Sequence, residues 1–241
     1  MIGRGGSDKA SAKKDKSEAS ASTSKSKKEV RRDSVARTAF GLFIEQGYEK
    51  TTMRQIAYRA KILNGSLYNL FPSKDDIFDH IMMKAIEVRH ESCTSMIEDE
   101  KDYLYALALP FVVGLYACDL SPKVAELFHE AYGNWNTFDK ITDLDIGWLT
   151  HVSERFSLAL DQEHLKQNII AIDGCLSKLI DRSVFTDDSD VNENARTFMI
   201  VMFTLLNLPL HSIDHILQRF DELLSEPNAW DRFMIWPDFS E

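Results

Sequence analysis

Residues 52–71 constrain the fold most strongly, because they contain two short helical segments separated by a break at residues 61–63. The first segment opens with Thr52, and Gln55 follows three residues later in the spacing of a capping box. Two helices that cross steeply need a small residue at their closest approach and apolar residues in the wedge between them. Ala57 is the small residue, and the wedge is supplied by Ile56, Ala60, Ile62, Leu67 and Leu70. The pattern predicts a helix-turn-helix.

One helix is expected on each side of this unit. On the amino-terminal side, apolar residues recur at the i, i+3, i+4, i+7 spacing of a helix at Ala36, Ala39, Phe40 and Phe43. Gly47 predicts the end of that helix. On the other side, Pro72 ends the motif, and Ser73 with Asp76 predicts the start of a longer helix that reaches about residue 97.

The remainder of the chain also has helical periodicity. Helices are expected near residues 103–118, 121–135, 137–160, 162–182, 191–208 and 211–224, and no stretch has the sustained alternation of a strand. The uncharged stretches 103–118 and 197–213 are shorter than the roughly 20 apolar residues of a membrane span. Both are predicted to be buried core helices, and no membrane is expected. The sequence therefore predicts an all-α protein.

Charge is distributed unevenly along the chain. The 241 residues carry a formal net charge of −10, but residues 1–74 have a balance of +9 and residues 75–241 a balance of −19. Residues 1–28 are rich in Ser and Lys and poor in apolar side chains, which predicts a disordered basic tail. This tail is either a solubilising segment or an arm that follows a phosphate backbone. The expected domains are residues 29–74, a three-helix DNA-binding unit, and residues 75–241, a larger helical body.

The second helix of the motif presents short polar residues to the outside. Those that do not fill the wedge are Asn64, Gly65, Ser66, Tyr68 and Asn69. Such a surface suits a major groove about 12 Å wide, where side chains meet the donors and acceptors of base edges. Basic residues lie where phosphates would pass, namely Arg54, Lys61 and Lys74, and Arg31 and Arg32 precede the first helix. These features favour binding of double-stranded DNA.

The run TTMRQIAYRAKILNGSLYNLFPSKDDIF resembles the DNA-binding signature of TetR/AcrR-type bacterial transcriptional regulators. The resemblance covers residues 30–90, about a quarter of the chain. It implies that Thr52 and Arg54 meet the DNA backbone, that Gly65 permits close approach, and that Tyr68 and Lys74 contact phosphates. It also implies that base edges are read by Asn64, Ser66 and Asn69.

Two residues depart from the family pattern. Lys61 occupies a turn position where the family prefers glycine, so a positive φ there would be costly. Leu63 stands where a Ser or Thr usually caps the recognition helix, and Asn64 or Ser66 is expected to cap it instead.

The resemblance implies a cytoplasmic homodimeric repressor that is released from a palindromic DNA operator by a small-molecule effector. The helix at 73–97 would transmit the change between domains. Residues 198–210 are apolar on more than one face, which fits either a dimer interface or a buried core helix.

A ligand pocket in the body is a further hypothesis. Aromatic and apolar residues on its central helices are candidates for the lining, namely Phe111, Leu115, Trp135, Trp148 and Phe156, with Tyr116 and Tyr132 nearby. The alternative is that they are simply core residues. The acidic surroundings and the aromatic rings favour a lipophilic or cationic ligand over an anion.

A metal-dependent oxidase is the competing interpretation. Glu87 with His90 and Glu126 with His129 have the Glu-x-x-His spacing of di-iron helical bundles. The helix at 103–118 offers no additional glutamate, so exposed surface pairs are the favoured explanation. No nucleophile elbow, phosphate loop or dinucleotide-binding turn is present. The chain is therefore expected to be neither an enzyme nor a holder of a metal or cofactor.

Overall fold

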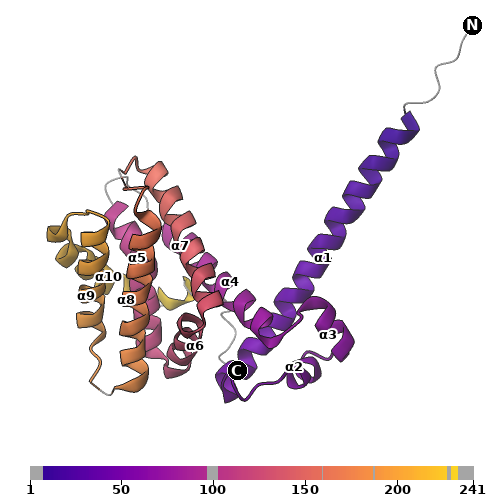
Figure 1. The fold of residues 1–241 in the computed structure, drawn as a ribbon, viewed down its shortest axis with the longest axis horizontal. Coiled ribbons are helices and arrows are strands. Elements are labelled where there is room, and N and C mark those ends of the chain that lie inside the picture. The colour runs from indigo at the N-terminus through magenta and orange to yellow at the C-terminus, as the bar shows by residue number, and fades with distance from the viewer. Residues whose placement is uncertain (1–7, 97–102, 159, 187, 227–228, 233–241) are drawn as a thin grey trace, which may run out of the picture.

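The computed structural model describes residues 8–96, 103–158, 160–186, 188–226 and 229–232. Within these ranges the regular structure consists of helices without a β-strand, which confirms the all-α prediction. Figure 1 shows a small amino-terminal unit on one side and a larger helical body on the other.

The amino-terminal unit consists of α1 (Asp8–Gln46), α2 (Met53–Arg59) and α3 (Asn64–Leu70). As predicted, α1 ends at glycine, because Gly47 adopts φ +89° and its N–H donates to the carbonyl of Phe43 at 2.9 Å. The expected apolar positions form the core, in which Ala36, Ala39, Phe43, Ile56, Ala57 and Leu67 are buried. The predicted packing of the helix-turn-helix is confirmed.

The first half of α1 differs from the expected disordered tail. Residues 1–7 lie outside the described residues, but the chain is helical from Asp8 onward and extends away from the body (Figure 1). No Gly or Pro occurs between Ser7 and Phe40, and Ala, Lys and Glu are favourable helix formers. Once the packed half of α1 has formed, adding further turns avoids the cost of a new nucleus.

Helix α4 (Lys74–Ser95) connects the two parts of the molecule. The predicted cap is present, because the Ser73 hydroxyl accepts a hydrogen bond from the Asp76 N–H at 3.0 Å. Helix α4 packs against α1, and it also packs against α5 (Tyr103–Leu120) and α7 (Trp135–Arg155) of the body. Asp33 of α1 is held by His80 and Lys84 of α4 at 3.0 and 2.5 Å.

Among the described residues the body contains six α-helices, namely α5 (Tyr103–Leu120), α6 (Pro122–Gly133), α7 (Trp135–Arg155), α8 (Leu165–Phe185), α9 (Val191–Leu205) and α10 (Ile213–Leu224). Two short 3-10 helices, η2 (Leu210–Ser212) and η3 (Ala229–Arg232), flank α10. Helix α8 packs against both α6 and α9. In the described part of the chain, α5 alone is long and apolar enough to cross a membrane, and 72% of that apolar window is buried. Helix α5 is thus a core helix, as predicted.

Candidate nucleic-acid interface and the buried polar cluster

Helix α3 presents a polar face to solvent. Leu67 is fully buried and Leu70 is half-buried, so these two residues fix which side of the helix faces inward. The remaining five residues are exposed, namely Asn64, Gly65, Ser66, Tyr68 and Asn69. The structure therefore brings together all five outward positions expected from the sequence.

The carboxyl end of α3 is tied to α1 by Arg32. Its Nη1 donates to the main-chain oxygen of Leu70 at 2.7 Å, and its guanidinium carbon lies 4.2 Å from the centre of the Phe71 ring. From the sequence, Arg32 was noted only as a basic residue that precedes the first helix. Its role inside the domain was missed, because a contact across 38 positions leaves no local signal.

The turn before α3 uses a strained lysine. Lys61 has φ 55°, which confirms that the position requires a left-handed backbone. Its N–H donates to the carbonyl of Tyr58 at 3.2 Å, and the N–H of Ile62 donates to that of Ala57 at 3.0 Å. These bonds form a Schellman motif, in which a non-glycine residue at the left-handed position costs about 1–2 kcal/mol.

The amino end of α3 lacks the expected side-chain cap. Leu63 is the N-cap residue and makes no capping hydrogen bond through its side chain. The expectation that Asn64 or Ser66 caps the helix in place of Leu63 is wrong. Among the described residues neither side chain makes a capping hydrogen bond, and both side chains are exposed. Both residues already lie inside the helix, so their side chains are past the point where the first N–H groups are exposed.

The residues expected at the DNA backbone have different environments. Thr52 is exposed and forms the predicted capping box with Gln55, while Arg54 is exposed on α2. Lys74 is instead held against the amino-terminal unit. Its Nζ donates to the main-chain oxygen of Tyr48 at 2.9 Å and lies 3.9 Å from the centre of the Tyr48 ring.

A second site lies inside the body and was not predicted as a unit. It is formed by Arg89 and His90 of α4, Tyr132 of α6, Asp145 of α7 and Asp173 of α8, each at most 6% exposed. We call these five residues the polar cluster. Several of their atoms have no hydrogen-bond partner among the described residues, namely Arg89 Nε and Nη2, His90 Nε2, Tyr132 Oη, both carboxylate oxygens of Asp145 and Asp173 Oδ1.

Burial sets the protonation of the polar cluster. Burial and the neighbouring Asp145 carboxylate raise the pKa of Asp173, and burial also raises the pKa of Asp145. Two buried carboxyl groups in contact retain a proton because both cannot ionise side by side. Burial and the positive charge of Arg89 lower the pKa of His90 to about 3, so its imidazole is neutral. His90 Nε2 lies 2.9 Å from Asp145 Oδ1, although the angles are not those of a hydrogen bond.

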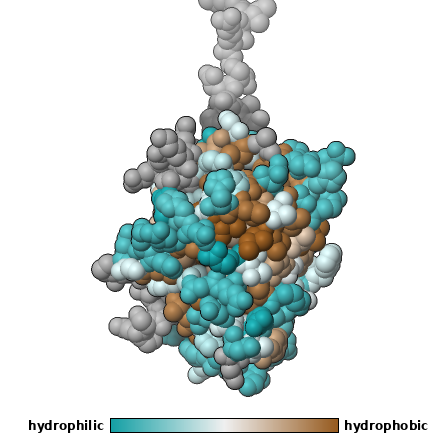
Figure 2. Space-filling view, turned by 90° about the vertical axis from the view of Figure 1, so that its left-hand side faces the viewer, coloured by the Kyte–Doolittle hydropathy of each residue, from teal (hydrophilic) through white to brown (hydrophobic). Residues whose placement is uncertain are grey.

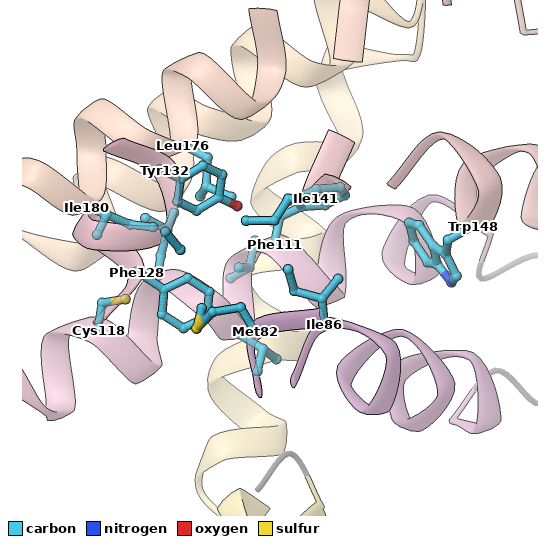
Figure 3. Packing of buried hydrophobic residues seen from close by; sticks show 14 of the residues in the cluster. Met82, Ile86, Phe111, Cys118, Phe128, Tyr132, Ile141, Trp148, Leu176 and Ile180 are labelled. Carbon is cyan, nitrogen blue, oxygen red and sulfur yellow. The ribbon is translucent and has the colours of Figure 1, made fainter. Parts of the chain in front are cut away.

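The expected ligand-lining residues are only partly brought together. Phe111, Leu115 and Trp148 are buried in the body, and the ring centres of Phe111 and Trp148 are 6.1 Å apart. Figure 3 shows Phe111 and Trp148 among the buried residues of the body. Phe156 is half-buried at the end of α7. Trp135 is 71% exposed and does not join them.

The position of Trp135 follows from where α7 begins. The sequence placed Trp135 in the last turn of the preceding helix, but Asn134 caps α7 by accepting from the N–H groups of Asn136 and Thr137. Trp135 is therefore the first residue of α7. It is one of the residues that line a surface hollow of about 340 Å³, and its ring stacks on that of Phe138 at 5.7 Å.

The two Glu-x-x-His pairs do not form a metal site. His129 Nδ1 lies 2.7 Å from Asp181, and Glu126 pairs with Lys123 at 2.9 Å. In the described residues no group of three or more potential metal ligands occurs. The expectation of two exposed pairs is nevertheless wrong for His90, which is buried in the polar cluster.

Comparison with known proteins agrees with this geometry. Residues 36–81 match the family described as bacterial regulatory proteins, tetR family. The HTH-type transcriptional regulator HbdR of Aromatoleum sp. (strain CIB) is 37% identical over 70 residues, which are 29% of this chain and 31% of HbdR. The HTH-type transcriptional repressor KstR2 of Rhodococcus jostii (strain RHA1) is 46% identical over 55 residues, which are 23% of this chain and 27% of KstR2. The chain thus matches about a third or less of the length of these relatives.

Similarity to solved structures covers most of the chain. RolR, in its crystal structure with the ligand resorcinol, has a TM-score of 0.62 at 17% identity, covering 80% of this chain and 96% of RolR. A TetR transcriptional regulator from Rhodococcus sp. RHA1 has a TM-score of 0.59 at 16% identity, covering 75% of this chain and 97% of its own. The amino-terminal unit therefore matches the tetR family in sequence over residues 36–81, and most of the chain shares the fold of these two solved structures.

Proposed function

We propose that the protein is a sequence-specific transcriptional repressor that binds a palindromic DNA operator as a homodimer. The observation that carries the proposal is the exposed polar face of α3, held in place by Arg32 at its carboxyl end. In this arrangement Asn64, Ser66 and Asn69 read base edges while Thr52, Arg54 and Tyr68 contact the backbone. Gly65 permits close approach, and Lys74 contributes its charge while it remains packed against Tyr48.

An apolar surface on the body supports the dimer. The side of the molecule that carries α9 and α10 shows a broad hydrophobic area (Figure 2). Ile200 of α9 and Leu210 just after it are 45% and 49% exposed, while Phe198, Met199, Met202 and Phe203 are fully buried. Residues 198–210 therefore contribute to the core and also leave apolar side chains for a second copy. A two-fold dimer would place two copies of α3 on two half-sites.

The body would bind the effector that releases the operator. RolR, which shares the fold, has been crystallised with resorcinol, and this supports a small aromatic effector for the present chain. Arg89 and His90 of α4 are buried in the body. Nearer the start of α4, His80 and Lys84 contact Asp33 of α1. An effector that binds more tightly to one position of α4 would shift the separation of the two α3 helices. The site of action is the cytoplasm, where the bacterial chromosome lies.

Selection of bound duplexes from a random pool tests the proposal. The full chain is expected to enrich a palindrome, and binding to it should weaken steeply as salt increases, because phosphate contacts release counterions. A scrambled duplex of the same composition is the control. Failure to enrich any sequence at low salt, with the protein folded, would contradict the proposal.

A further inference from the structure

We propose that the polar cluster binds an uncharged hydroxylated aromatic molecule, a phenol or a dihydroxybenzene. The inference rests on the proposed function, because this molecule would be the effector. It goes further by assigning the residues that bind the effector and the chemistry that they select.

The first argument is the number of unpaired groups in one place. Arg89, Tyr132, Asp145 and Asp173 come from four helices. Arg89 Nε and Nη2 and Tyr132 Oη are buried and have no hydrogen-bond partner among the described residues, whereas the carboxyl groups of Asp145 and Asp173 contact each other. Leaving such an atom unpaired is unfavourable, and more so when it is charged. Several together at the centre of a domain indicate a polar occupant that completes their hydrogen bonds.

The second argument is hydrogen-bond complementarity. Arg89 offers only donors, while Asp173 Oδ1 and the Asp145 carboxylate act mainly as acceptors. A hydroxyl group donates and accepts at the same time, so one hydroxyl satisfies a carboxylate and accepts from Arg89. Tyr132 Oη can do either. In Figure 3 the Tyr132 hydroxyl points inward, toward Phe111 and Ile141.

The third argument is charge. Arg89 contributes one positive charge, the two carboxyl groups that retain a proton contribute one negative charge, and His90 is neutral. The polar cluster is therefore balanced without a ligand. A carboxylate or an ammonium ion would bring an uncompensated charge into the core, which is strongly unfavourable.

The fourth argument is the aromatic surroundings. The rings of His90 and Trp148 stack at 4.7 Å, and Arg89 lies 5.8 Å from the centre of the Phe128 ring. Phe111 contacts Trp148 edge-on at 6.1 Å. A flat ring packs on such faces in offset or edge-on geometry, and its hydroxyl groups then reach the polar atoms.

Gly114 of α5 makes room for the arginine. A Cβ at this position would lie 2.7 Å from Arg89 Nη1, closer than real contacts allow. The guanidinium therefore lies across α5 only because position 114 lacks a side chain. Since Arg89 belongs to α4, a ligand held by it acts directly on the helix that contacts the amino-terminal unit.

Calorimetry on the full chain without DNA tests the inference. Phenol and the three dihydroxybenzenes are the probes, and toluene, benzoate and benzylammonium are matched molecules that lack a hydroxyl or carry a charge. The hydroxylated probes are expected to bind at least tenfold more tightly than all three controls. Tyr132→Phe should weaken phenol binding about tenfold, equivalent to about 1.4 kcal/mol.

Matched variants separate binding from folding. Tyr132→Phe removes an unpaired hydroxyl, so the free protein should stay folded. Tyr116→Phe is the control, because the Tyr116 hydroxyl bonds to Asn192 away from the polar cluster. Absence of phenol binding at millimolar concentration, equal binding of toluene, or unchanged affinity in Tyr132→Phe would overturn the assignment. Phenol binding by a chain that enriches no duplex would support the polar cluster and contradict the repressor.

Discussion

Arg32 of α1 and Leu70 of α3 are joined by a hydrogen bond of 2.7 Å from the guanidinium to the main-chain oxygen. The last carbonyl groups of a helix have no partner within the helix and carry its negative dipole end, so a cation is a favourable donor there. The same guanidinium covers the ring of Phe71. The direction in which α3 presents its polar face therefore depends on a residue far upstream in the sequence.

Arg32→Ala should destabilise the amino-terminal unit by about 1–3 kcal/mol, because a charged hydrogen bond and a cation–π contact are lost together. Hydrogen exchange of the α3 amides with urea denaturation would measure the loss. Arg31→Ala is the matched control, since Arg31 is exposed, and it should change stability by no more than about 0.5 kcal/mol. Equal effects of the two substitutions would contradict the anchoring role.

Asn69→Ala should weaken operator binding by about 5- to 150-fold, because a bidentate amide–base contact contributes about 1–3 kcal/mol of discrimination. The loss should fall on one base position of the selected palindrome, while the salt dependence stays unchanged. Titration of labelled duplexes altered at single positions would measure this. Asn136→Ala removes an exposed amide from α7 and should leave operator affinity intact. A uniform loss across all duplexes would instead indicate that Asn69 contacts phosphate.

Lys61→Gly should stabilise the protein by about 1 kcal/mol, because glycine adopts the left-handed backbone of this turn without the Cβ clash. Lys50→Gly is the control. Lys50 is exposed and is not among the described residues with positive φ, so glycine there should destabilise through unfolded-state entropy. Thermal unfolding of both variants measures the difference, and a loss of stability in Lys61→Gly would disprove the strain.

Local patterns were sufficient to predict the amino-terminal unit. Gly47, the capping box at Thr52 and the cap at Ser73 are signals contained within a few residues, and each occurs where expected. The spacing of apolar residues also identified which side of α3 faces inward, because that side is set by the helical repeat. The roles of the exposed residues at the DNA remain predictions.

Contacts between distant helices could not be predicted from local patterns. Arg89 and His90 have the appearance of surface residues in the sequence, and only the packing of α4 against α5 and α7 shows that they are buried. Trp135 was assigned to a cavity because the end of α6 was misplaced by two residues, which turns a side chain to another face. Aromatic content alone did not distinguish the core from the surface.

Gly114→Ala should destabilise the body by about 1 kcal/mol or more, because the buried Arg89 guanidinium must leave its place. Gly147→Ala provides the comparison within the same domain. A Cβ at Gly147 of α7 meets nothing within 4 Å, so alanine should stabilise its helix by about 0.5–1 kcal/mol. Urea denaturation of both variants would reveal opposite signs. Stabilisation in both would show that Arg89 moves at no cost.

Asp145→Asn should stabilise the protein more at pH 8 than at pH 5. Burial raises the pKa of Asp145 above its usual 3.8. At pH values between this usual pKa and the raised pKa of the folded state, the folded state therefore binds more protons than the unfolded state. The stability contributed by protonated Asp145 is present below the usual pKa and is lost as pH rises toward the folded-state pKa, by about 1.4 kcal/mol per pH unit. Asparagine mimics the protonated side chain and escapes this loss.

The difference in unfolding free energy between variant and wild type, measured by urea denaturation at several pH values, should therefore grow with pH. His90 has the opposite sign, because its pKa is lowered to about 3 and its contribution is lost as pH falls below its usual 6.5. Because His90 is present in both the variant and the wild type, most of its effect cancels in the difference between their unfolding free energies. Asp143→Asn on the same helix is the control, because Asp143 is exposed and pairs only loosely with Lys166 at 3.7 Å. If the unfolding free energy of Asp145→Asn relative to wild type is as independent of pH as that of the control, the buried carboxyl group is ionised throughout. The charge balance inferred for the polar cluster would then be wrong.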